Sequence, residues 1–190
     1  MPMDGGEQDQ SATIAFLEAQ GGAVERIDTH GAIIFLTGDR VFKLKRAVDL
    51  GYLDFSSLAS REAACRAEWT LNRRTAPDLY CGVRPVLRAK DGTISWQGPG
   101  EVVDWVVVMR RFPAHDLMTQ VAARGDLDQA MLRALADGVA AFHAGARVLP
   151  DGDGAGRMRA VIMGNGRSFA AIASDLLPRD RIGELQEQSL

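Results

Sequence analysis

Hydrophobic and polar residues alternate along much of the first 110 positions, in the period-two pattern of β-strands. Two alternating runs, Ala32–Thr37 and Arg40–Arg46, flank the dipeptide Gly38-Asp39. Because glycine reaches positive φ freely, this dipeptide predicts a two-residue β-hairpin. Alternation divides the second run between two faces, with Val41, Lys43 and Lys45 on one and Phe42 and Leu44 on the other.

A short helix is expected before the first strands. Residues 1–10 are acidic and polar and predict a disordered tail. Ser11 is predicted to cap an amphipathic segment that ends at Gly21-Gly22. Residues 1–23 therefore form a tail and a short helix, and strand patterns begin at Val24.

A single helical pattern separates two groups of strands. It runs from Ser56 or Ser57 to Arg74 and stops before Ala76-Pro77, because the residue before a proline disfavours helix. Strand patterns then resume in three runs, which are Val83–Arg88, Thr93–Trp96 and Val102–Met109. Three strands, one helix and three strands predict an α+β lobe: an antiparallel sheet with one helix inserted in its middle.

Everything after Pro113 has a helical pattern. A short helix is predicted over Asp116–Arg124, and a longer one, capped by Asp126, runs to about Ala146. The glycines of Gly164-Asn165-Gly166 predict a turn. Two short helices are expected after this turn, at Ser168–Leu177 and Arg181–Gln188.

Composition is that of an ordinary globular protein, with 46% hydrophobic and 25% charged residues. The net charge of -3 argues against a nucleic-acid partner, which would need a broad basic surface. Cys65 and Cys81 form no metal motif and no disulfide framework. The longest apolar stretch, Trp105–Met109 with Val102 and Val103 before it, is too short to cross a bilayer. The sequence therefore predicts a cytoplasmic protein without a membrane partner.

The predicted central helix carries a carboxylate on its apolar side, where Glu68 shares a face with Ala64, Cys65, Leu71 and Asn72. Burying this carboxylate unpaired would cost several kcal/mol, so a cationic partner is expected. Lys43 is favoured, although Lys45 points the same way and a strand lysine can also serve only to prevent aggregation. Val41, before Lys43 on the same face, is placed to contact a base. Kinases need such a lysine–carboxylate pair to hold nucleotide phosphates.

Four runs of the chain together resemble the aminoglycoside-phosphotransferase-like family: Thr29–Arg46, Gly51–Phe55, Leu71–Tyr80 and Val107–Phe112. The resemblance is to the bacterial group in which such a domain is often fused to a downstream P-loop ATPase domain. It covers roughly residues 24–146.

The resemblance implies a protein-kinase-like fold that binds ATP. Residues 24–112 would form the N-lobe and hinge, and residues 113–190 the first helices of an incomplete helical C-lobe. By the same resemblance Lys43 anchors the phosphates and Glu68 holds it. The other implied roles are adenine binding by the backbone of the hinge residues Met109, Arg110 and Phe112, and ribose binding by Asp116.

Catalytic residues of the family are missing from this pattern. The His-x-Asp loop with its asparagine, and the later metal-binding aspartate, have no match in residues 147–190, and His115-Asp116-Leu117 lacks the required spacing. Mg²⁺ is expected for the complete family domain, but its ligands are absent, so we expect no turnover by this chain, either as a fragment or as a degenerate relative. Three hypotheses for the function of the chain follow. The first is the nucleotide-binding part of a small-molecule phosphotransferase with an unknown acceptor. The others are a non-catalytic nucleotide-binding or regulatory module, and an α+β domain whose lysine–glutamate pair is purely structural.

Overall fold

The computed structural model describes residues 9–148, 152–171 and 178–190, and the chain divides into two compact units, 1–142 and 143–190. Helices and strands follow one another along the chain as α1 (Ser11–Glu18), β1 (Glu25–Asp28), β2 (Ala32–Thr37), β3 (Arg40–Lys45), α2 (Leu58–Asn72), β4 (Tyr80–Arg88), β5 (Ile94–Ser95), β6 (Glu101–Arg110), the 3₁₀ turn η1 (Ala114–Asp116), α3 (Met118–Ala123), α4 (Gln129–Ala144), α5 (Gly154–Ala171) and α6 (Arg179–Ser189).

The six strands form one antiparallel sheet in the order β1-β2-β3-β6-β4-β5. Strand β3 lies inside the sheet, paired with β2 on one side and β6 on the other. The β2–β3 hairpin closes at Gly38, whose φ of 40° is the positive value that the sequence required. The predicted α+β class, with a helix inserted into an antiparallel sheet, is confirmed.

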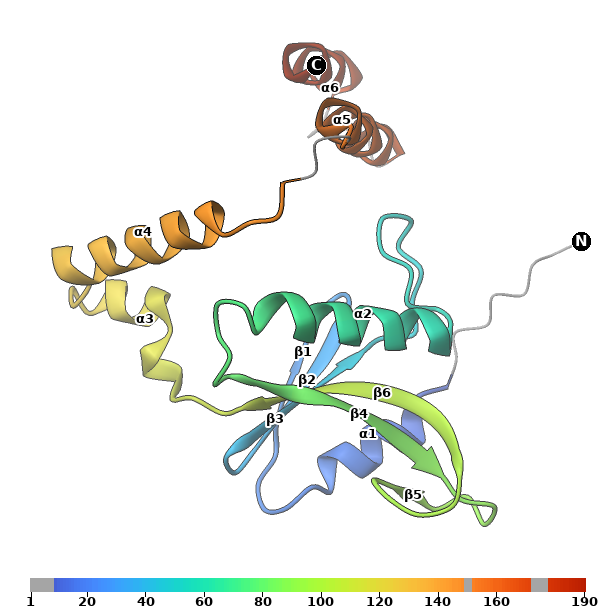
Figure 1. The fold of residues 1–190 in the computed structure, drawn as a ribbon. Helices are drawn as coiled ribbons and strands as arrows, with labels where there is room; N and C mark the ends of the chain where they lie inside the picture. The colour runs from blue at the N-terminus through green and yellow to red at the C-terminus, as the bar shows by residue number, and fades with distance from the viewer. Residues whose placement is uncertain (1–8, 149–151, 172–177) are drawn as a thin grey trace, which may run out of the picture. The chain divides into compact units, whose positions relative to one another are not determined.

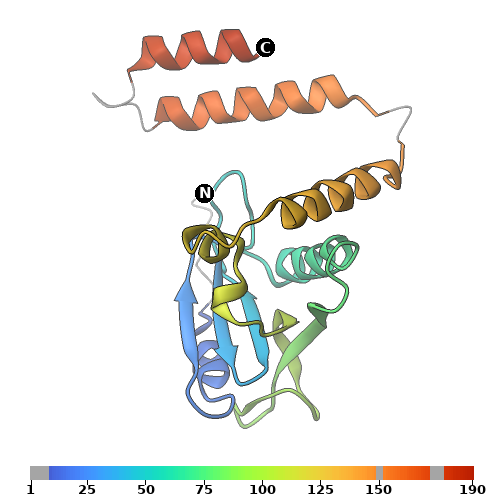
Figure 2. The same ribbon diagram turned by 90° about the vertical axis from the view of Figure 1, so that its left-hand side faces the viewer.

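One helix covers each face of this sheet (Figure 1). The face covered by α1 holds the main hydrophobic core, in which Leu17 of α1 packs with Ile33, Phe35, Phe42, Leu44, Val86, Val103, Val106 and Val108. Helix α2 lies on the opposite face, where it packs against β6 and β4 (Figure 1 and Figure 2). The alternation predicted for β3 is confirmed, because Phe42 and Leu44 enter the core while Lys43 and Lys45 point to α2.

The start of α1 differs from the prediction. Gln10, not Ser11, is the N-cap residue, and the Ser11 amide donates to Asp9 Oδ1 at 2.8 Å. Asp9 and Gln10 therefore belong to the folded structure and not to a tail, because the Gln10 side chain is hydrogen-bonded to the sheet. The rest of the predicted tail, residues 1–8, lies outside the described residues.

Helices α3 and α4 begin later than predicted. Leu117 has an extended backbone, with ψ of 132°, so the short helix starts at Met118 and Asp116 belongs to the preceding 3₁₀ turn. The cap of α4 is Asp128, whose Oδ1 accepts from the Met131 amide at 2.8 Å. Asp126, the predicted cap, instead pairs with Arg124 at 2.9 Å.

Helix α5 runs straight through Gly164-Asn165-Gly166, where a turn was predicted. The glycines do not end the helix, and a Cβ on Gly166 would lie 1.9 Å from Oε1 at the flexible end of the Gln186 side chain of α6. Residues 172–177 of the predicted helix Ser168–Leu177 lie outside the described residues, and α6 agrees with the predicted Arg181–Gln188 within two residues at each end. Among the described residues, none of the helices has the length and hydropathy needed to cross a membrane.

Amide hydrogen exchange should be slower in the sheet than in helix α5. Val106 and Val107 of β6 are fully buried, whereas Met158 and Val161 of α5 are 61% and 56% exposed. Because opening free energy follows the apolar contacts that must be broken, we expect the β6 amides to exchange far more slowly than those of α5. Equal protection of the two elements, measured on the full chain by NMR or mass spectrometry, would contradict this expectation.

Candidate functional site

Strand β3 and helix α2 bring together Lys43, Lys45 and Glu68, a group that we name the Lys–Glu cluster. Lys43 Nζ donates to Glu68 Oε1 at 2.8 Å, and Lys45 Nζ donates to Glu68 Oε2. The predicted pairing of Lys43 with Glu68 is confirmed. The alternative that Lys45 makes the contact is also correct, because the two lysines share the one carboxylate.

Local sequence explains how the cluster forms. Alternation along β3 sends both lysines to the α2 face. Ser57 caps α2 by accepting from the Ser60 amide at 3.0 Å, and from there Arg61, Cys65 and Glu68 follow at helical spacing. The buried side of α2 is thus unusually polar. Leu71, expected on the same side as Glu68, is 57% exposed.

Two opposing effects act on the carboxylate of Glu68. Burial raises its pKa, but hydrogen bonds and charge attraction from Lys43 and Lys45 outweigh burial, and the pKa lies below the usual 4.5. The carboxylate is therefore ionised near neutral pH. Two ammonium groups facing one carboxylate leave the cluster with a net positive charge.

Exposure differs sharply between the two lysines. The side chain of Lys43 is 28% exposed, against 10% for Lys45 and 11% for Glu68. Lys45 also lies over the ring of Phe55, 5.3 Å from its centroid. Since the chain has three lysines in all, two of them are concentrated at this one site.

Neighbouring polar groups add no charge to the cluster. The hydroxyl of Tyr80 accepts from Asn72 Nδ2 at 3.1 Å, and burial together with the Glu68 charge raises the pKa of Tyr80. Burial also raises the pKa of the Cys65 thiol to about 12. Both groups stay neutral at physiological pH, so the excess charge of the cluster is not cancelled by them.

A buried ion pair between α2 and β6 was not predicted. Arg61 Nε donates to Asp104 Oδ1 at 2.9 Å, and the two side chains are 0% and 1% exposed. Arg61 also donates to the carbonyl oxygens of Phe55 and Ser56, and Asp104 accepts from Gln10 Nε2 at 2.6 Å. The helical spacing of Arg61 with Glu68 was the available signal, because it places an arginine on the same buried side.

The predicted hinge, Met109–Phe112, begins at the end of strand β6, which pairs with β3. Val41 is buried and stands opposite Met109 in the β3–β6 pairing. The Arg110 amide donates to the Leu79 carbonyl at 2.9 Å, and the Arg111 amide donates to the Asp39 carbonyl at 2.8 Å. These two amide donors are thus already used by backbone carbonyls of the chain itself.

Phe112 and Asp116 are not brought into contact with the Lys–Glu cluster in the part of the chain that the structure describes. Phe112 is 38% exposed just after β6. Asp116 lies in the exposed turn η1, with Oδ1 3.4 Å from Nε2 of His115. The roles predicted for these residues stay predictions.

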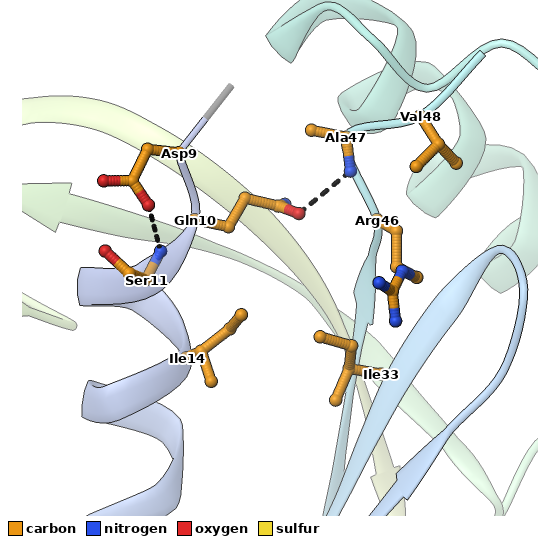
Figure 3. Close-up of a pocket in the computed structure, with 8 residues that line it drawn as sticks. All are labelled: Asp9, Gln10, Ser11, Ile14, Ile33, Arg46, Ala47 and Val48. Atoms are coloured by element: carbon orange, nitrogen blue, oxygen red, sulfur yellow. Dashed lines mark hydrogen bonds between the residues drawn. The ribbon is translucent and has the colours of Figure 1, made fainter. Parts of the chain in front are cut away.

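Two open hollows of the described surface are lined by residues other than Lys43, Lys45 and Glu68. One of about 410 Å³ is lined by residues around the start of α1 and the end of β3, among them Gln10, Ile14, Arg46 and Ala47 (Figure 3). Another, of about 990 Å³, lies between the turns at 88–92 and 99–101. Nowhere in residues 9–148, 152–171 and 178–190 do three His, Cys, Asp or Glu side chains gather as metal ligands.

Comparison with known proteins finds distant relatives. Uncharacterized proteins of Mycobacterium tuberculosis and Mycobacterium bovis are 33% identical to this chain over 116 residues, which is 61% of its length. The chain spans 22% of the length of these relatives. No family model matches the chain, and no solved structure matches it.

Breaking the buried ion pair should destabilise the sheet unit strongly. Asp104→Asn leaves Arg61 buried without a counter-charge, and we expect a loss of about 3–5 kcal/mol of unfolding free energy. Urea titration followed by tryptophan fluorescence measures it, since Trp69, Trp96 and Trp105 all lie in the unit 1–142. The matched control is Glu62→Gln, which removes the exposed pair Glu62–Arg66 and should cost less than about 1 kcal/mol. Equal losses for the two variants would contradict the assignment.

Stability should depend on pH through Glu68. Because its folded-state pKa lies below the usual 4.5, ionised Glu68 stabilises the fold above that pH, and the contribution is lost as pH falls through the folded-state pKa. The unfolding free energy of the wild type minus that of Glu68→Gln should therefore be largest near neutral pH and shrink in acid. A difference that is constant from pH 7 to pH 3 would show that Glu68 is not held by the lysines.

Proposed function

We propose that this chain contributes the ATP-binding part of a small-molecule phosphotransferase with a protein-kinase-like N-lobe, of the aminoglycoside-phosphotransferase-like kind. The observation that supports the proposal is the Lys–Glu cluster: a lysine inside a sheet, held at 2.8 Å by a carboxylate from the one helix on that face. Such a pair is what the kinase class uses to anchor nucleotide phosphates.

Charge at the cluster favours an anionic ligand. One carboxylate faces two ammonium groups, and burial makes the excess positive charge more effective than it would be in water. A phosphate oxygen would neutralise that excess. A purely structural pair would need only one lysine, so the second lysine supports ligand binding over the structural hypothesis.

Lys43 is the lysine that we assign to the phosphates. It is the more exposed of the two, and its ammonium group has three donors, of which Glu68 takes one. Lys45 is nearly buried between Glu68 and the ring of Phe55, where an incoming phosphate has little access. Lys45 then keeps Glu68 neutralised while Lys43 contacts the ligand.

Base and ribose contacts are assigned to the end of the β3–β6 pair. Val41 lies on the same face as Lys43, opposite Met109. Because the Arg110 amide is bonded to Leu79, that donor is not open to adenine, and the assignment moves to the backbone beyond it, at Phe112. Asp116, exposed in η1, is assigned to the ribose hydroxyls.

A second candidate is a nucleotide-binding or regulatory module without chemistry of its own. It is favoured by the sequence, because the His-x-Asp loop with its asparagine and the later metal-binding aspartate have no match in residues 147–190. ATP binding without magnesium dependence and without turnover is the result that this candidate expects. Under either candidate the proposed partner is a nucleotide, and the small-molecule acceptor is not assigned.

ATP affinity should depend on Lys43. Losing a charge-assisted contact to phosphate costs about 1.5–3 kcal/mol, so we expect Lys43→Ala to weaken ATP binding by roughly 10-fold or more in calorimetry. Lys90→Ala removes the one lysine outside the cluster and controls for net charge. Because the chain has three lysines, selective ¹³C labelling of lysine side chains gives few resonances, and the Lys43 signal should move most on ATP addition.

Two outcomes would overturn the proposal. No ATP binding by a folded wild-type chain would favour the structural hypothesis for the Lys–Glu cluster. Equal weakening by Lys43→Ala and Lys90→Ala would show that binding is not located at the cluster.

A further inference from the structure

The side chain of Gln10 makes two hydrogen bonds to the sheet and one to the segment just after β3. Its Nε2 donates to the Lys45 carbonyl at 2.9 Å and to Asp104 Oδ2 at 2.6 Å, and its Oε1 accepts from the Ala47 amide at 2.9 Å. Figure 3 shows this side chain reaching from the start of α1 to the segment that leaves β3. A single amide side chain thus joins α1, the end of β3 and β6.

We propose that Gln10 is a positioning residue for the Lys–Glu cluster, fixing the end of β3 at Lys45 directly and the α2 helix that carries Glu68 through Asp104 and Arg61. Its consequence for phosphate binding rests on the function proposed above, but the positioning itself does not.

Gln10 is connected to the Lys–Glu cluster by two routes, one through Asp104 and Arg61 and one through Lys45, and all three of these residues are buried. The two carboxylate oxygens of Asp104 are divided, with Oδ1 accepting from Arg61 and Oδ2 from Gln10. Arg61 lies on α2 roughly two turns before Glu68, on the same buried side. A shift of Asp104 therefore moves α2, and a shift of the Lys45 backbone moves the ammonium group that holds Glu68 Oε2.

Removing Gln10 should loosen the lysines around Glu68. Charged and titratable groups that face Glu68 are Lys43 and Lys45 of β3, Cys65 of its own helix and Tyr80 of β4. Burial alone raises the pKa of Glu68, and the lysine contacts lower it. If Lys45 is held less well, its contact with Glu68 lowers the pKa of that carboxyl by less. The effect of burial then predominates, and the pKa of Glu68 rises.

The chain offers a matched control in Gln20. This glutamine follows the other end of α1 and also bonds to the sheet unit, with Oε1 accepting from Trp96 Nε1 at 2.7 Å and Nε2 donating to the Phe16 carbonyl at 3.0 Å. It has no bond to Lys45, Asp104 or Arg61. Gln20→Ala therefore removes the hydrogen bond that joins the other end of α1 to Trp96, without touching the connection to the cluster.

The experiment is an NMR titration of the Glu68 side-chain carboxyl carbon, assigned with Glu68→Gln, in the wild type, Gln10→Ala and Gln20→Ala. We expect Gln10→Ala to raise the pKa of Glu68 by about 0.5 unit or more and Gln20→Ala to leave it unchanged. Gln10→Asn, which keeps the amide but is one methylene shorter, gives the same readout if Gln10→Ala does not fold.

The pKa of Glu68 tests the positioning role of Gln10, and ATP binding tests the proposed function. An unchanged pKa of Glu68 in the folded Gln10 variant, or an equal rise in Gln20→Ala, overturns the positioning role. A rise specific to Gln10→Ala supports it even if the wild type binds no ATP, in which case only the proposed function fails. A wild type that binds ATP should bind it more weakly after Gln10→Ala, and unchanged affinity would overturn the consequence for phosphate binding.

Discussion

A fully buried ion pair between Arg61 and Asp104 connects the helix on one face of the sheet to the core strand β6. Removing two charges from water is costly, and only complete hydrogen bonding compensates for it. Arg61 meets Asp104 and two carbonyl oxygens, and Asp104 also accepts from Gln10 and from the Trp105 amide. Directional bonds of this kind determine the position of α2 more narrowly than apolar packing would.

The rest of the site follows from the position of α2. With Arg61 fixed, Cys65 faces the sheet and Glu68 reaches the two lysines of β3. The two ion groups that join this helix to the sheet differ in kind, because Arg61–Asp104 is neutral and buried, whereas the Lys–Glu cluster keeps a positive charge and a partly exposed lysine. A closed pair suits a structural role, and a charged, accessible one suits a ligand.

Local patterns predicted the parts of this structure that depend on near neighbours. The Gly38-Asp39 hairpin, the two faces of β3 and the pairing of Lys43 with Glu68 follow from alternation and helical spacing. Arg61 and Asp104 are 43 positions apart, and no local pattern relates them. The glycines of α5 were misread for the same reason, since the close approach of Gln186 to Gly166 is a tertiary contact and glycine alone indicates a turn.

The two cysteines of this chain differ in exposure, with Cys65 buried and Cys81 exposed. Cys65 is buried under α2 with its pKa raised to about 12, so it presents no thiolate to a reagent at neutral pH. Cys81 is exposed at an irregularity of β4, with its sulfur 3.2 Å from Arg40 Nη1. A thiol-directed fluorophore would therefore attach at one position of the unmodified protein, one residue from Tyr80, and report on that end of the sheet without any engineered cysteine.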